Sequence, residues 1–447
     1  MSWYYAGVER TLILDCIKKV GESVKIYGFV QVSRDHGKIV FLDVSDRSGL
    51  VQVVVSGEEV SDLHPQDVVS ITGKVSKRSE NLRNKNIPTG EIEISAEKVE
   101  VLSESAELPF DMGGKELDLQ LPTLLDFRSL TLRHHKIKAI LKVQAAILKG
   151  FRKAAVDLDC TEIIVPTIVA GATEGGAEVF KIDYYNHKAY LSQSPQLYKQ
   201  MLVPVFERVF TVTKAYRAEP SVTTRHLAEI TQMDCEFGFV EFDELLDLLE
   251  EVAVKTIKYV QDECGHILFE YGMETIAVGL NKAPRLTLRE AQEIIFQETG
   301  RDNRKEKDLT PQDEVDLCLW SRRKHQSDLV IITHFPTQAK PFYTMPDPKD
   351  PEYSLSYDLL FRGVEILSGA QRINNYEELV ESIKDRGMNP DNFEMYLQAF
   401  KYGMPPEGGF SFGLERMTML ILNLANVREA SLFPRDMERV DIRLSSK

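Results

Sequence analysis

Apolar and polar positions alternate in short runs over the first hundred or so residues. The runs are separated by Gly, Asp, Ser and Asn, and this pattern predicts five short β-strands. The strands are expected over residues 24–30, 39–44, 50–55, 67–75 and 91–95. Five strands within so short a segment are typical of an OB-fold barrel, which commonly binds oligonucleotides. We therefore predict a five-stranded OB-fold barrel over residues 1–102.

The pattern then changes. Residues 103–130 carry Pro, Gly and acidic side chains without periodicity, so we expect a linker there. Apolar positions with helical spacing predict a long amphipathic helix over residues 134–157. A strand is expected next, over residues 161–165, ending before Pro166. Helices continue to alternate with antiparallel strands, which predicts an α+β domain over residues 131–447, with an antiparallel sheet flanked by helices.

A polar loop in this domain lies between two runs of period two, residues 208–213 and 229–236. Such flanks predict an antiparallel hairpin. The loop contains Arg217 and Arg225. Two guanidinium groups so near in sequence repel unless an anion lies between them, and arginine binds phosphate or carboxylate in a bidentate manner. The loop is therefore a candidate anion site, and a solvated hairpin tip is the alternative.

Two later segments also carry candidate chemistry. Residues 358–372 form a predicted strand pair with charged positions, and residues 402–416 are Gly-rich and enter a helix with Arg416 in its first turn. A helix N-terminus with an arginine suits an anion, although a glycine turn with a surface arginine is the simpler interpretation. The intervening helices, expected over 241–262 and 286–298, would either cover the sheet or form an insertion.

Composition narrows the class of protein. A chain of 447 residues with 43% hydrophobic and 28% charged residues is long enough for two or three globular domains. The net charge of −15 does not favour nucleic-acid binding, although a local basic face can provide it. The five cysteines form no C-x-x-C pair, which argues against structural zinc and fits a reducing cytoplasm. No apolar run approaches the length of a membrane span. We expect a cytoplasmic protein without a membrane segment.

The motifs of the second predicted domain, and their order along the chain, resemble those of the class II aminoacyl-tRNA synthetases. The strand ending at Pro166, the hairpin with Arg217 and the turn over 409–416 resemble motifs 1, 2 and 3 of that class. Residues 193–200 and 368–372, together with the segment over 173–178, resemble aspartyl-tRNA synthetases of the archaeal and eukaryotic type. The resemblance covers nearly the whole chain. It implies an ATP-dependent, AMP-forming ligase that joins L-aspartate to the 3′ end of tRNA(Asp) through an aspartyl-adenylate.

The resemblance also implies roles for single residues. Arg217 would be catalytic and would contact both the aspartate carboxylate and the ATP α-phosphate. The other residues implied to hold ATP are Glu219, Arg225, His226, Leu227, Glu365, Gly413, Leu414, Glu415 and Arg416. The residues implied to bind aspartate are Glu174, Gln196, Lys199, Arg217, Ser368 and Arg372, with Gln232 and Asp234 as candidates for its α-amino group. Glu365 and Ser368 would ligate Mg²⁺, the implied cofactor. The implied anticodon contacts are Gln31, Phe41 and Gln52.

There are two alternatives, of which only the second belongs to a different functional class. An asparaginyl-tRNA synthetase shares the architecture, but the cations of Lys199 and Arg372 suit a carboxylate and would lack a counter-charge beside an amide. A synthetase-like paralogue, acting as a free amino-acid ligase or a binding protein, would lack the barrel or one of Arg217, Glu365 and Arg416. All of these are present. We therefore expect an aspartate–tRNA ligase that forms a homodimer through the motif 1 helix and strand.

Some positions depart from the pattern of the family. Residues 220–222 replace a more polar stretch, Glu407 stands where relatives often have His, and Phe412 stands where a smaller residue is common. Near Gln31, relatives that read the anticodon strictly tend to have a bulky aromatic residue. The sequence therefore leaves open whether tRNA(Asn) is a second substrate. Phe41, in an apolar strand, has barrel core as its alternative role.

Overall fold

The computed structural model describes residues 9–37, 39–56, 63–171, 179–220, 223–273 and 275–444. The chain divides into two compact units, residues 1–121 and 122–447. Across the described ranges, no helix is both long enough and apolar enough to cross a membrane.

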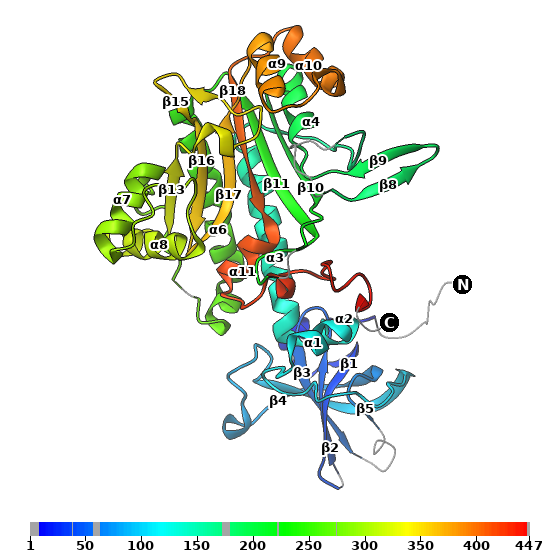
Figure 1. Ribbon diagram of the computed structural model, residues 1–447. Helices are drawn as coiled ribbons and strands as arrows, with labels where there is room; N and C mark the ends of the chain where they lie inside the picture. The colour runs from blue at the N-terminus through cyan, green and yellow to red at the C-terminus, as the bar shows by residue number, and fades with distance from the viewer. Residues whose placement is uncertain are drawn as a thin grey trace. The chain divides into compact units, whose positions relative to one another are not determined.

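The N-terminal unit contains a closed barrel with the strand order β1-β2-β3-β5-β4 (Figure 1). Its strands are β1 (Ser23–Asp35), β2 (Ile39–Ser45), β3 (Leu50–Ser56), β4 (Val68–Lys77) and β5 (Ile92–Ser103), with the short 3-10 helices η1 (Ile13–Lys18) and η3 (Glu80–Leu82) beside them. This confirms the OB-fold prediction. The first and last strands are longer than predicted. β4 pairs with β5 in an antiparallel manner, and the register of this pairing shifts at Gly73. A Cβ atom on Gly73 would lie only 2.4 Å from the Ser95 carbonyl oxygen.

The second unit is built around an eight-stranded sheet with the order β12-β13-β16-β17-β18-β11-β10-β6 (Figure 1). Its strands are β6 (Thr161–Glu162), β10 (Arg208–Tyr216), β11 (Glu229–Gly238), β12 (Arg285–Thr287), β13 (Leu329–Thr333), β16 (Ser356–Phe361), β17 (Val364–Gln371) and β18 (Glu407–Gly413). The pairs at the two edges are parallel and the others are antiparallel. The predicted hairpin is confirmed as β10 and β11, and the α+β class is confirmed.

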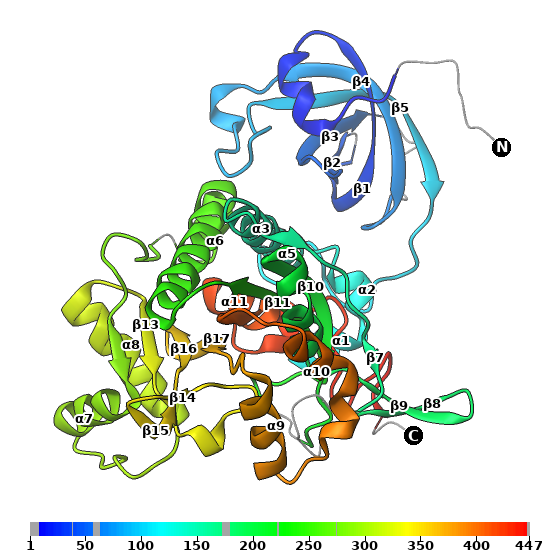
Figure 2. The ribbon, with the colours of Figure 1, turned by 90° about the horizontal axis from the view of Figure 1, so that it is seen from above.

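Two long helices, α3 (His135–Val156) and α6 (Phe242–Glu270), pack against each other and cover one face of this sheet (Figures 1 and 2). Phe151 of α3 packs edge-on against Phe210 of β10 and Phe412 of β18. Phe412 is therefore a core residue. At the far edge, α7 (Leu288–Thr299) and α8 (Pro311–His325) each begin with a capping box, set by Thr287 and Thr310. Their apolar faces pack on β13 and β16.

The remaining elements surround the sheet. They are α1 (Leu121–Asp126), α2 (Arg128–Thr131), β7 (Ile168–Val169), β8 (Lys181–Tyr184), β9 (His187–Leu191), α4 (Gln196–Met201), α5 (Val203–Phe206), η4 (Thr337–Ala339), β14 (Pro346–Asp347), β15 (Asp350–Ser354), α9 (Tyr376–Asp385), η5 (Pro390–Phe393), α10 (Glu394–Lys401), α11 (Leu414–Ile421) and η6 (Val427–Ala430). In Figure 1, α4, α9 and α10 gather at one end of the sheet, and the β8–β9 hairpin projects from its side.

In the second unit, three elements differ from the prediction. The strand expected over 161–165 pairs only at Thr161 and Glu162, because the chain then turns away toward Pro166. The helix expected over 241–262 continues to Glu270 through a bend at Cys264, whose φ of −120° is not helical. The Gly-rich segment does not only enter a helix, since its residues 407–413 form a central strand of the sheet.

Candidate functional site

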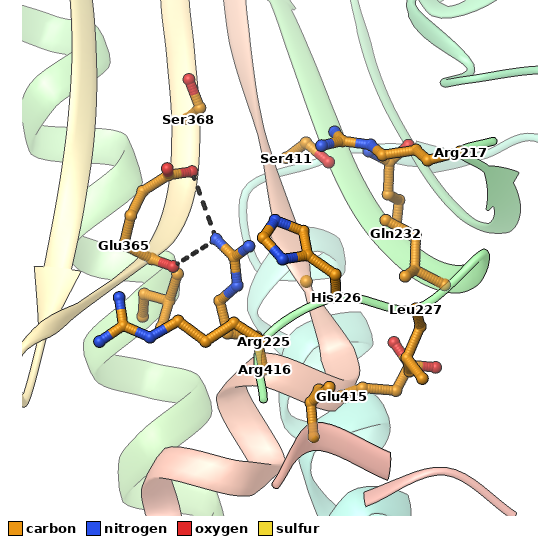
Figure 3. A pocket seen from close by; sticks show the side chains of 14 residues that line it. Arg217, Arg225, His226, Leu227, Gln232, Glu365, Ser368, Ser411, Glu415 and Arg416 are labelled. Atoms are coloured by element: carbon orange, nitrogen blue, oxygen red, sulfur yellow. Dashed lines mark hydrogen bonds and ion pairs between the residues drawn. The ribbon is translucent and has the colours of Figure 1, made fainter. Parts of the chain in front are cut away.

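Three segments that are distant in sequence line one cavity of about 290 Å³ in the second unit. They are the loop between β10 and β11 with the start of β11, the strand β17, and the passage from β18 into α11, with Val427 of η6 beside them. The lining residues are Arg217, Arg225, His226, Leu227, Ile230, Gln232, Glu365, Ile366, Ser368, Ser411, Gly413, Glu415, Arg416 and Val427. Nine of the residues singled out for ATP or Mg²⁺ from the sequence are among them. Figure 3 shows Glu365 and Ser368 on one side of the cavity and Arg217 and Gln232 on the other.

The hairpin loop brings three potential cations to the cavity. Arg217 is half-buried, and its guanidinium has no hydrogen bond or ion pair within the described part of the chain. Arg225 donates to Glu314 of α8 at 3.2 Å. Burial lowers the pKa of His226 and the nearby arginines lower it further, which together outweigh the opposite effect of Glu219. His226 is therefore neutral at pH 7, and Arg217 is the cation of the loop that is left to meet an anion.

Arg416 projects from the first turn of α11 toward β17. It donates to the backbone oxygen of Glu365 at 2.8 Å and lies 3.8 Å from its carboxylate (Figure 3). Burial, together with the negative charge of Asp358, raises the pKa of Glu365 to about 7. Asp358 is itself held by Lys340, with contacts of 3.2 and 3.3 Å.

A divalent cation fits beside Glu365. Such an ion would favour the ionised form of this carboxyl group, which burial and the charge of Asp358 disfavour, and the Ser368 hydroxyl on the same strand supplies a second oxygen donor. Among the residues that the structure describes, no three His, Cys, Asp or Glu side chains form a complete metal cluster. Mg²⁺ commonly takes one or two carboxylates from the protein and its other ligands from phosphates and water. The two oxygen donors on β17 match that mode.

Behind the cavity lies a buried network of charges. Lys199 of α4 pairs with Asp234 at 2.8 Å and with Glu236 at 2.9 Å, and Arg372 donates to Glu236 at 2.8 Å. Burial alone would lower the pKa of Lys199, but the two carboxylates outweigh it and the pKa is raised. Ser411, which lines the cavity, donates to Asp234 at 2.7 Å. The network is thus joined to the cavity through one hydroxyl group.

The expectation that Lys199 and Arg372 lack a counter-charge unless a substrate carboxylate binds is wrong. Asp234 and Glu236 already pair with them, so these four groups sum to zero charge. Sequence reasoning missed Glu236 in this role because it stopped at the Gln232–Asp234 face. The same alternation along β11 continues to residue 236, so the signal was present.

Amide side chains complete the network. Gln196 accepts from Arg372 at 3.3 Å and donates to Gln200 at 3.0 Å. Gln200 in turn donates to Glu407 at 2.7 Å. The side-chain oxygen of Gln232 is buried without a hydrogen-bond partner in the described chain. Because Gln232 also lines the cavity, this oxygen is placed to accept from a ligand amine.

Four further predicted residues lie outside the described structure, lie outside the cavity, or are already bonded within the protein. Glu174 is outside the described residues. Glu219 does not line the cavity and lies 3.9 Å from His226. Leu414 is buried in the core. Glu415 lines the cavity, but both its carboxylate oxygens accept from Thr231, at 2.8 and 2.9 Å, so it fastens α11 to β11. Ser411, Ile230, Ile366 and Val427 were not predicted.

The predicted anticodon residues share the outer surface of the barrel. Val40, Leu42 and Val44 point into the core, so Phe41 between them faces outward and is half-buried. Phe41 is thus not barrel core. Gln52 also faces outward and donates to Glu93 at 3.3 Å. Gln31 donates to Ser45 at 2.8 Å.

Comparison with known proteins gives the family. Residues 120–437 match the family of tRNA synthetases class II (D, K and N), and residues 24–102 match the OB-fold nucleic acid binding domain. The chain is 42% identical over 433 residues to the aspartate–tRNA(Asp/Asn) ligase of Thermus thermophilus, which covers 96% of this chain and 99% of that protein. It is 38% identical over 437 residues to the aspartate–tRNA(Asp) ligase of Pyrococcus horikoshii, covering 94% and 96%.

A solved structure agrees. Asparaginyl-tRNA synthetase from Pyrococcus horikoshii, complexed with asparaginyl-adenylate, matches with a TM-score of 0.87 and 30% identity over 97% of this chain and 100% of that chain. These findings confirm the resemblance that the motifs indicated. The chain therefore belongs to the class II tRNA synthetases of the D, K and N group, and it is an aminoacyl-tRNA ligase with an OB-fold domain.

Proposed function

We propose that this enzyme joins L-aspartate to the 3′ end of tRNA(Asp) through an aspartyl-adenylate, with release of pyrophosphate and AMP. The observation that carries the proposal is the cavity lined by Arg217 and Arg416, joined through Ser411 to the buried network of Lys199, Arg372, Asp234 and Glu236. The part of the site next to Lys199 and Arg372 would receive a small dicarboxylic amino acid, and the cavity between Arg217 and Arg416 would receive a nucleoside triphosphate. The identity of 42% and 38% to two aspartate–tRNA ligases, each over nearly the full length, supports the same substrates.

Adenylate formation needs no nucleophile from the protein. The α-carboxylate of aspartate attacks the α-phosphate of ATP, and pyrophosphate leaves. Arg217, whose guanidinium is free of partners in the described chain, would contact both reacting groups and stabilise the negative charge that develops between them. Arg416 would hold ATP from the opposite side, and His226 and Leu227 would contact it from the loop. Positioning and electrostatics then account for most of the catalysis.

Glu365 and Ser368 would hold Mg²⁺ together with ATP. When bound, the ion supplies positive charge to the phosphates. A bound cation would favour the ionised carboxylate of Glu365 against the burial that raises its pKa to about 7.

In the amino-acid pocket, Lys199 and Arg372 would bind the side-chain carboxylate and Gln196 would orient it. Gln232, with its unpaired oxygen, would accept from the α-amino group. Asparagine is the competing substrate, and the likeness to an asparaginyl-tRNA synthetase favours testing it directly. The test is amino-acid-dependent ATP–pyrophosphate exchange with each amino acid. Exchange supported as efficiently by asparagine as by aspartate would contradict the proposal.

The barrel would read the anticodon with Gln31, Phe41 and Gln52. We further propose tRNA(Asn) as a second substrate, because Gln31 is not a bulky aromatic residue and the Thermus relative is named for both tRNAs. Aminoacylation of purified tRNA(Asp) and tRNA(Asn) with labelled aspartate tests this. A preference for tRNA(Asp) above about 100-fold, which is about 2.7 kcal/mol, would contradict the second substrate and leave the aspartate ligase intact. Gln31→Trp should increase the preference.

The enzyme would act as a homodimer through α3 and the segment after β6, which correspond to motif 1. Ile164 in this segment has a side chain that is 99% exposed, which is unusual for a large apolar residue beside an edge strand.

A further inference from the structure

Glu407 is a fully buried carboxyl group that the proposed reaction leaves without a role. It is the first residue of β18 and lies behind the network of Lys199 and Arg372. One of its oxygens accepts from Gln200 at 2.7 Å, and the other, Oε2, has no hydrogen-bond partner in the described part of the chain. The side chain nevertheless lies within hydrogen-bonding reach of Glu236.

Two carboxylates can share a hydrogen bond only if one of them holds a proton. Glu236 is kept ionised, because Arg372 and Lys199 outweigh the effect of burial and lower its pKa. Within the described ranges no cation donates a hydrogen bond to Glu407, and burial together with Glu236 raises its pKa well above the usual range. The proton therefore belongs to Glu407.

Among the described residues, the groups around Glu407 keep a constant charge near neutral pH. The titratable and charged groups that face it are Glu236 from β11, Tyr357 from β16, Arg372 after β17 and Tyr396 from α10. Burial raises the pKa of both tyrosines, so they stay neutral. The buried network as a whole then contains the cations Lys199 and Arg372, the anions Asp234 and Glu236, and the neutral acid Glu407.

Glu407 is also linked mechanically to the substrate pocket. Glu407 accepts a hydrogen bond from Gln200 at 2.7 Å, and Gln200 accepts one from Gln196 at 3.0 Å. Gln196 in turn accepts one from Arg372 at 3.3 Å. Tyr396 fixes the same amide of Gln200 at 3.1 Å. A change at Glu407 therefore reaches both the charge of the pocket and the orientation of Gln196.

We propose that Glu407 is a positioning residue for amino-acid recognition, and that it must hold its proton for the pocket to accept a side-chain carboxylate. The inference rests on the proposed aspartate specificity. With neutral Glu407, a bound aspartate shares two cations with two carboxylates of the protein. Ionised Glu407 would add a third buried carboxylate, which repels the side chain of aspartate and has a much smaller effect on the uncharged side chain of asparagine.

The test compares wild type with Glu407→Gln, an amide that matches the neutral acid in shape and can still donate to Glu236. The KM for aspartate in ATP–pyrophosphate exchange is measured from pH 6 to 10. In wild type it should rise about tenfold per pH unit once Glu407 ionises, while kcat and the KM for ATP change much less. In Glu407→Gln the rise should be absent. Inhibition by asparagine should depend little on pH in either protein.

Glu250→Gln is the matched control. Glu250 is also a buried carboxylate, but it binds the backbone of Ala283 at 2.7 Å, away from the pocket, so its profile should follow wild type. A second readout is equilibrium unfolding. A raised pKa means that folded wild type keeps a proton that the unfolded chain loses, so its stability falls as pH rises above the pKa of an exposed carboxyl. Glu407→Gln should lack this loss.

The outcomes are distinct. Parallel pH profiles of wild type and Glu407→Gln would overturn the role of Glu407 while leaving aspartate as substrate. A failure of Glu407→Gln to fold would also overturn it, because the neutral isostere should be tolerated. Absence of aspartate-dependent exchange at pH 6 to 7 in wild type would instead refute the proposed function, and the unfolding data would then decide whether Glu407 holds a proton.

Discussion

Arg217 is the single residue whose loss should separate catalysis from folding. Its side chain has no partner in the described structure, so Arg217→Ala should not change thermal unfolding. It should lower aspartate-dependent ATP–pyrophosphate exchange by about 10²–10³-fold, because one preorganised donor to the transition state is lost. Lys214→Ala is the control, since Lys214 is exposed on the same hairpin and pairs with Glu229 at 3.3 Å. A loss of less than tenfold for Arg217→Ala would contradict its catalytic role.

Single residues also mark where sequence reasoning ends. The cations at Arg217 and Arg416 could be predicted, because the hairpin and the helix entry that carry them are local patterns. The alternation along β11 places Asp234 and Glu236 on one face, but their pairing with Lys199 could not be predicted, because Lys199 comes from another element and meets them only in the folded core. The charge of the pocket was therefore misjudged. Glu407 could be seen to depart from the family, but its hydrogen bond to Gln200 joins residues 207 positions apart.

Among the elements, β18 depends most on glycine. A Cβ atom on Gly409 would lie 2.1 Å from the Cys235 carbonyl oxygen and 2.3 Å from the Glu236 carboxylate, both on the neighbouring strand. Gly409→Ala should therefore push β18 from β11 and cost about 3 kcal/mol in the free energy of unfolding. Urea denaturation measures this, and the same variant should weaken aspartate binding.

Gly265→Ala is the matched control for Gly409→Ala. Gly265 lies in α6, and a Cβ atom there would meet nothing within 4 Å. Alanine in a helix is favoured over glycine by about 0.5–1 kcal/mol, so this variant should be neutral or slightly more stable. Equal effects of the two substitutions would contradict the steric argument.

Elements with strong periodicity were predictable and others were not. The barrel strands and the β10–β11 hairpin alternate clearly, and their bounds differ from prediction mainly at the ends. β18 was missed as a strand because Gly408, Gly409 and Gly413 carry no side chain to show alternation. The strand over 161–165 was overestimated because its apolar residues suggested internal pairing. The exposure of Ile164 fits instead the proposed contact with a second copy.

For the whole molecule, this contact gives a test of assembly. β6 is the last strand of the sheet, so its outer edge is open within the described chain. Ile164→Asp should not disturb folding of the subunit, since the side chain is 99% exposed, but it should convert a dimer into a monomer. Light scattering after size-exclusion chromatography measures the mass. Leu280→Asp, at another exposed apolar position, should stay dimeric. A dimeric Ile164→Asp protein would place the interface elsewhere.

The division into two units predicts that tRNA reading and adenylate formation can be separated. Phe41 faces outward from a barrel whose core is filled by the alternating residues of β2, so Phe41→Ala should leave the barrel folded. Stacking of a base on an aromatic ring contributes about 1–3 kcal/mol, so kcat/KM for tRNA(Asp) should fall about 5- to 150-fold. Pyrophosphate exchange without tRNA should be unchanged.

Val101→Ala is the control for this variant, because Val101 is a half-exposed apolar residue on β5 of the same barrel. It should affect neither reaction. Loss of exchange activity in Phe41→Ala would mean that the barrel supports the catalytic unit itself. Unchanged aminoacylation would mean that the base-stacking surface lies elsewhere on the barrel. Only a selective loss of aminoacylation agrees with an anticodon contact at Phe41, because the first reaction needs no tRNA and the second depends on it.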